Sequence, residues 1–143
     1  MKYKEGQINK VYILKFDHGE NFLEELNKFV IEKNIKSGII NFIGALDTGK
    51  IVQGPKKIHP LEPFVSNFDV PKETVGTGTI FWSNKEPKIH IHGLFGDYKE
   101  SFFGCLRGNA NVFLIIEAII YELDIQAKRM YDEKTKLELL NLD

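Results

Sequence analysis

The sequence predicts an α+β protein of one domain, built from a mixed or antiparallel β-sheet and one main helix near the N-terminus. The chain has 143 residues, which is the length of one domain. Its one clear helical pattern of apolar residues lies at about residues 20–33, and the segments around it have strand character. No repeat, linker or low-complexity tract divides residues 1–143, so we expect a single domain.

The first elements are a strand and the helix. Residues 11–16 are rich in β-branched and aromatic side chains and predict a strand. Asp17 is a suitable helix cap, and Glu20 follows it at capping-box spacing. Asn34 is suited to end the helix in a left-handed conformation. One apolar face of the expected helix consists of Phe22, Leu23, Leu26, Phe29 and Val30.

The middle of the chain predicts two strands and a long loop. Residues 37–46 have strand character, with Gly44 as a bulge or a point of close approach. Residues 50–53 follow a turn and predict a returning strand. Residues 54–71 hold four of the five prolines and include His59, so we expect a long irregular surface loop there.

The second half of the sequence predicts strands only. Residues 112–123 are almost continuously apolar and β-branched, which is typical of a central strand buried on both faces. Two short strands are expected to close the sheet after it. The strands expected in this half are residues 75–82, 88–95, 102–106, 112–123, 127–131 and 136–140.

Composition excludes several classes of protein. The net charge is −1, which excludes a strongly basic nucleic-acid binder while allowing a local basic patch. Only Arg107 and Arg129 are available for bidentate reading of guanine. A lone cysteine, Cys105, excludes an internal disulfide. The longest apolar stretch, residues 112–121, is too short to cross a membrane. With no signal peptide at the start, these features predict a cytoplasmic protein with no membrane partner.

His90 and His92 form the most informative local feature. On a strand, residues two apart point to the same face, so both imidazoles can share one metal ion. The alternative is a pair of polar side chains on a solvated strand. Cys105 follows thirteen residues after His92 and is expected on the neighbouring antiparallel strand, where its thiolate would complete a zinc ligand set. The alternative for this cysteine is a small buried apolar residue.

Glu117 interrupts the most hydrophobic stretch of the chain. A buried carboxylate there would need a partner or a proton. One interpretation is a buried ion pair with Arg107, Arg129 or a lysine. The other is a group that supports a metal-bound histidine or acts as an acid or base, which makes Glu117 the candidate catalytic residue. His18 is expected to be a turn residue, and His59 to be solvated or to complete a metal site.

Several short segments, taken in order, resemble the PPC (plant and prokaryote conserved) domain family. They carry the resemblance through their order and spacing, which together cover about residues 11–140. His90 and His92 lie in the segment that resembles the family's His-x-His motif. The matching segments are residues 17–20, 40–46, 78–80, 87–92, 103–108, 117 and 129–132.

The resemblance implies a homotrimer with a PPC-like fold that is similar to acetolactate decarboxylase, a zinc enzyme. Some prokaryotic members look like zinc proteins that use the His-x-His pair and a third histidine. Here His90 and His92 match, but Cys105 stands at the third position. A thiolate donates more charge than an imidazole and makes zinc a poorer Lewis acid. The Arg-Gly-Arg-Pro hook that reads DNA in plant members is absent from this sequence.

Three functions follow as hypotheses. The first is a cytoplasmic homotrimer that acts as a regulatory or DNA-associated binding protein, with weak DNA or a protein as partner and with zinc bound by His90, His92 and Cys105. The alternative is a zinc-dependent enzyme that acts on a small oxo-acid. The third is a structural oligomer whose histidines no longer bind metal.

Overall fold

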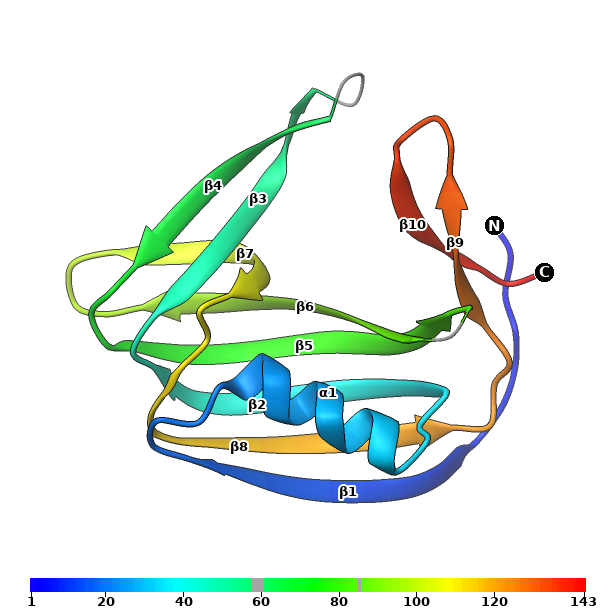
Figure 1. Ribbon diagram of the computed structural model, residues 1–143, viewed down its shortest axis with the longest axis horizontal. Helices are drawn as coiled ribbons and strands as arrows, with labels where there is room; N and C mark the ends of the chain where they lie inside the picture. Colours follow the sequence, from blue (N-terminus) through cyan, green and yellow to red (C-terminus); the bar gives the residue numbers. More distant parts are fainter. Residues whose placement is uncertain (58–60, 85) are drawn as a thin grey trace.

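The computed structural model describes the chain except residues 58–60 and 85 (Figure 1). Its elements confirm the predicted α+β class. Within the described residues, the only helix, α1, spans 11 residues, and no helix is long and apolar enough to cross a membrane. The elements in chain order are β1 (Ile8–Asp17), α1 (Phe22–Glu32), β2 (Ser37–Leu46), β3 (Gly49–Lys57), β4 (Glu62–Phe68), β5 (Lys72–Ser83), β6 (Glu86–Gly96), β7 (Ser101–Gly108), β8 (Val112–Leu123), β9 (Lys128–Asp132) and β10 (Leu137–Asn141).

The strands form one sheet in the order β1-β8-β2-β5-β6-β7-β3-β4, and all neighbours along this path are antiparallel. The late strand β8 therefore lies between the two earliest strands. The β9–β10 hairpin joins β5 through a parallel bridge between Trp82 and Lys128. In Figure 1 the β3–β4 and β9–β10 hairpins rise at opposite ends of the sheet.

Helix α1 covers one face of the sheet over β2 and β8 (Figure 1). Phe22, Leu26 and Val30 are buried beneath it, as the helical spacing predicts. The Phe22 ring lies 5.0 Å from Phe16 and 4.9 Å from Phe42, centroid to centroid. Burial of each large apolar side chain contributes about 1.5–3 kcal/mol. The opposite face of the sheet, called the outer face below, is not covered by α1.

The helix begins later than predicted. Asp17 ends β1, and the helix cap is Asn21, whose side-chain oxygen accepts a hydrogen bond from the backbone N–H of Glu24 at 3.2 Å. The predicted contact with Glu20 does form, because its carboxylate accepts from the backbone N–H of Asp17 at 2.8 Å. It closes the turn before the helix instead of capping it. Asn34 ends the helix with φ 55°, as predicted.

The prediction of an irregular loop at residues 54–71 is wrong. The chain forms the β3–β4 hairpin there, and β3 pairs with β7 and β4 instead of returning along β2. Pro55 and Pro63 lie opposite each other where the register shifts. Proline is tolerated at such irregular edge positions because no ladder hydrogen bond is lost. His59 lies outside the described residues.

Strand β8 is an internal strand next to the edge strand β1, and its burial pattern differs from the prediction. Ile116, Ala118 and Ile120 are buried, while Glu117 and Ile119 point to the exposed outer face. The predicted burial on both faces is therefore wrong. The strand is apolar throughout because the uncovered outer face is itself largely apolar. Glu117 is not a buried carboxylate.

Gly44 forms the bulge that the sequence predicts. Its φ is 142°, and the β2–β8 register shifts between Gly44 and Ala45. A Cβ at this position would overlap the carbonyl oxygen of Ile115, so only glycine fits.

Lys72 is buried at the start of β5 and holds the β6–β7 turn. Its Nζ lies 2.6 Å from Asp97 and 3.0 Å from Glu100. The ammonium group of Lys72, with backbone N–H donors of the turn, lowers the pKa of Asp97 from 3.8 to about 2. A carboxyl group with a lowered folded pKa adds stability above its unfolded pKa, and this stability is lost as the pH falls through the folded value.

We therefore expect Lys72→Met to destabilise the protein at pH 7 and to flatten the dependence of unfolding free energy on pH between about 4 and 2. Lys28→Met removes an exposed helix lysine that is paired with Glu25 and serves as the matched control. Urea unfolding measured across this pH range checks the expectation. Equal pH dependence in wild type and Lys72→Met would contradict it.

Candidate metal centre

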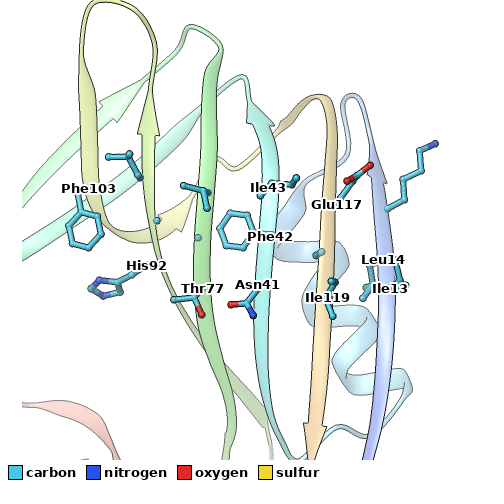
Figure 2. A pocket seen from close by; sticks show the side chains of 16 residues that line it. Ile13, Leu14, Asn41, Phe42, Ile43, Thr77, His92, Phe103, Glu117 and Ile119 are labelled. Atoms are coloured by element: carbon cyan, nitrogen blue, oxygen red, sulfur yellow. The ribbon is translucent and has the colours of Figure 1, made fainter. Parts of the chain in front are cut away.

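The antiparallel register of three strands brings His90, His92 and Cys105 together on the outer face. His92 lies opposite Cys105 on β7 and opposite Thr77 on β5, while His90 lies opposite Thr79. Directly opposed residues share one face of a sheet. Figure 2 shows His92 beside Thr77.

The ligand atoms of this metal group (His90, His92 and Cys105) lie within 4.8 Å of one another. The two Nε2 atoms are 3.1 Å apart. In a tetrahedral zinc site, bonds of about 2.0–2.3 Å place ligand atoms roughly 3.3–3.8 Å apart, so small side-chain rotations suffice. Two imidazoles and one thiol are a donor set that zinc accepts, with a fourth position left open. The residues present therefore fit a zinc ion.

The electrostatics of the group favour neutral histidine. Burial lowers the pKa of His90 to about 4, and the positive charges of His92, Arg129 and Arg107 add to this effect. His90 is therefore in its ligating, neutral form at pH 7. Burial raises the pKa of the Cys105 thiol, while the two arginines oppose that shift. A bound metal would displace the thiol proton.

Glu117 lies far from the metal group. It sits on β8, and strands β2 and β5 separate β8 from β6. In Figure 2 the carboxylate lies at the far side of the hollow from His92. Its cross-strand neighbours are Lys15 and Ile43, not the arginines considered from sequence. Within this chain Glu117 is not placed to hold an imidazole.

His18 also lies apart from the metal group. Its Nδ1 accepts a hydrogen bond from the backbone N–H of Leu114 at 3.2 Å, and its ring contacts Phe113. This agrees with the turn role that the sequence predicts.

A hollow of about 890 Å³ adjoins His92 on the outer face (Figure 2). Its lining is mostly apolar, and its polar members are Lys15, Asn41, Thr77, His92 and Glu117. Exposed apolar side chains extend across the same face from β1 to β7. These exposed outer-face residues are Val11, Ile13, Ile39, Ile43, Val75, Leu94, Phe103 and Ile119.

Arg107 and Arg129 lie beside the metal group and not beside Glu117. Arg107 follows Cys105 by two residues on β7, and Arg129 donates a hydrogen bond to Thr79, the cross-strand neighbour of His90. Their rarity in the sequence is the feature that could have indicated a site role, because Arg107 and Arg129 are the only arginines among 19 lysine and arginine residues.

Comparison with solved structures supports the fold. A metal-containing protein from Archaeoglobus fulgidus is 26% identical, with a TM-score of 0.86 over 97% of this chain and 98% of its own. A PPC protein from Pyrococcus horikoshii is 22% identical, with a TM-score of 0.84 over 100% and 99% of the two chains. A protein from Bacteroides thetaiotaomicron, described as a candidate DNA-binding protein, is 23% identical, with a TM-score of 0.85 over 95% and 94%. A search of curated proteins finds no match.

The family assignment comes from the sequence profile of the Plants and Prokaryotes Conserved (PCC) domain. The profile matches residues 3–124, which include strands β1 to β8, helix α1 and the complete metal group. The match ends before β9, so the β9–β10 hairpin lies outside it. This agrees with the resemblance seen in the short sequence segments. The chain therefore belongs to the Plants and Prokaryotes Conserved domain family.

Proposed function

We propose that this protein is a homotrimeric binding protein in which His90, His92 and Cys105 of each chain hold one zinc ion. The observation that carries the proposal is the convergence of three ligand atoms within 4.8 Å on neighbouring strands. The metal-containing relative from Archaeoglobus fulgidus, at 26% identity, supports a metal at this fold. A soft thiolate beside two imidazoles favours zinc over magnesium or calcium, which prefer oxygen ligands.

A cytoplasmic location suits this ligand set. A lone thiol is kept reduced by the cytosolic glutathione and thioredoxin systems, and only the reduced form binds zinc. A cytoplasmic location is therefore part of the proposal.

The alternative function is a zinc-dependent enzyme acting on a small oxo-acid. One observation favours it, namely the hollow of about 890 Å³ beside His92, which an open coordination position would face. Zinc bound there would act as a Lewis acid on a ligand oxygen. Charge donation from the Cys105 thiolate weakens that effect, so we place binding ahead of catalysis.

Zinc content tests the metal site directly. Tag-free protein incubated with zinc and then dialysed should hold one zinc per chain by elemental analysis. Loss of one ligand in His90→Ala or Cys105→Ser should lower zinc affinity by at least about tenfold, since even residues behind the ligands have effects of this size. Cys105→His should bind zinc more tightly than Cys105→Ser, because imidazole is also a zinc ligand.

The matched control is His18→Ala, which removes a histidine outside the metal group and should leave zinc content unchanged. Substitution of cobalt for zinc adds a specific readout, because a thiolate ligand gives a charge-transfer band that should vanish in Cys105→Ser. A protein that takes up no stoichiometric zinc, or keeps it in His90→Ala, would overturn the site.

The homotrimer accounts for the exposed apolar outer face. Contiguous apolar patches of this extent usually mark protein interfaces. Ile13 is 84% exposed and Phe103 is 63% exposed, although both are large apolar side chains. Copies of the same chain, related by cyclic symmetry, would cover such a face. The number of copies, three, comes from the family resemblance.

Light scattering checks the trimer. The wild type should have three times the 16.5 kDa mass of the chain. Ile43→Asp places a charge on the outer face and should shift the mass toward the monomer, because a buried unpaired charge is costly. Ile31→Asp is the control, since this helix residue is 50% exposed, close to the 56% of Ile43. A wild-type protein of monomer mass at micromolar concentration would contradict the trimer.

The partner that we propose is weakly bound DNA or another protein. The Bacteroides thetaiotaomicron structure is described as a candidate DNA-binding protein, which supports the DNA alternative. With a net charge of −1, this chain has few excess cations to neutralise phosphates.

Titration against duplex DNA at two salt concentrations tests this partner. We expect weak binding at low salt that falls as salt rises, with a slope set by the number of phosphates neutralised. Absence of binding at low salt would remove DNA from the proposal and leave a protein partner.

A further inference from the structure

Both arginines of the chain lie beside the metal group. The other basic residues are all lysines, which carry a point charge instead of a planar fork of donors. Arg129 comes from β9 and Arg107 from β7, so they approach the histidines from different elements. This placement of the only two guanidinium groups suits an anionic ligand, which arginine binds through paired hydrogen bonds.

Arg129 is held in place by two hydrogen bonds. Its Nη2 donates to Thr79 Oγ1 at 3.0 Å, and its Nη1 donates to the backbone oxygen of Glu138 at 3.3 Å. Thr79 is the direct cross-strand neighbour of His90, which places the guanidinium beside that imidazole. Its buried Nε has no hydrogen-bond partner among the residues that the structure describes. The group is thus oriented but not fully satisfied.

Arg107 follows Cys105 by two residues on β7, so its side chain leaves the same face of the strand. Its positive charge contributes to the lowered pKa of His90 and opposes the raised pKa of Cys105. Within the described parts of the chain, no hydrogen bond or ion pair is found for its guanidinium. Of the two guanidinium groups, only Arg129 has, among the residues described, an acidic side chain, Glu138, whose charge offsets its own.

Glu138, whose negative charge acts on Arg129, is shared with two other groups. Glu138 accepts a hydrogen bond from Ser83 at 2.5 Å and lies 3.0 Å from the ammonium group of Lys88. A zinc ion with one thiolate ligand would add a further net positive charge to the group. Arg129 is half-buried, whereas Arg107 is exposed to solvent. A half-buried positive charge is costly when its counter-charge is shared with other groups, and an anion bound between the two arginines would offset that cost.

We propose that Arg107 and Arg129 form an oxyanion-binding subsite beside the metal group, which takes a small carboxylate or a tetrahedral oxyanion. This inference rests on the proposed zinc site and names the class of ligand that the site would take. Guanidinium groups bind carboxylate and phosphate oxygens through paired hydrogen bonds.

Calorimetric titration of the zinc-loaded protein with pyruvate and with sulfate tests the subsite. At least one probe should bind, and Arg107→Gln and Arg129→Gln should each raise its Kd by about tenfold or more. Arg129→Lys keeps the charge but removes the paired donors, and it should also weaken binding. Lys28→Gln removes the same charge from an exposed helix position and should leave Kd unchanged. Preference for pyruvate identifies a carboxylate ligand, and preference for sulfate identifies a phosphate-like one.

Zinc content measured on the same samples separates this inference from the proposed function. Retention of one zinc per chain together with unchanged Kd in both arginine variants would overturn the subsite and leave the metal site intact. Arginine-dependent binding to protein that takes up no zinc would support the subsite and overturn the metal site. If neither the zinc-loaded nor the zinc-free protein binds pyruvate or sulfate, the subsite is overturned. If circular dichroism shows that Arg129→Gln does not fold, the Kd values of Arg107→Gln and Arg129→Lys test the subsite instead.

Discussion

The antiparallel register of β5, β6 and β7 is the constraint on which the rest of the structure depends. It sets Thr79 opposite His90, and His92 opposite Cys105, all on the face that α1 leaves uncovered. A slip of one residue in β6 would turn both histidines toward the helix side and end the convergence of the ligand atoms. The metal group is thus a property of strand pairing more than of any loop.

The single helix produces the second main feature of the molecule. Because α1 covers only one face of the sheet, the other face keeps its apolar rows in contact with solvent in an isolated chain. The metal group, the hollow and both arginines all lie on or beside that face. In the proposed assembly, a copy of the chain that covered the apolar rows would also contribute to the surroundings of His92.

The sequence predicted the helix face, the bulge at Gly44 and a place for Cys105 on the strand next to the two histidines, because each follows from spacing over a short stretch of chain. The sequence-based prediction failed for features that depend on pairing between strands far apart in the chain. The prolines between residues 54 and 71 indicated a loop, but an edge hairpin accepts them. Glu117 looked buried because both faces of β8 are apolar, and nothing local shows that one face stays uncovered. The approach of Arg129 to His90 depends on β9 joining β5, which local patterns do not contain.

X-ray absorption spectroscopy at the zinc edge tests the central claim most directly, because it reports the atoms bound to the metal. For protein loaded with one zinc per chain, the claim that His90, His92 and Cys105 converge on one ion predicts one sulfur at about 2.3 Å and nitrogen neighbours at about 2.0–2.1 Å. The sulfur should disappear in Cys105→Ser. A shell of oxygen and nitrogen alone in the wild type would contradict the account.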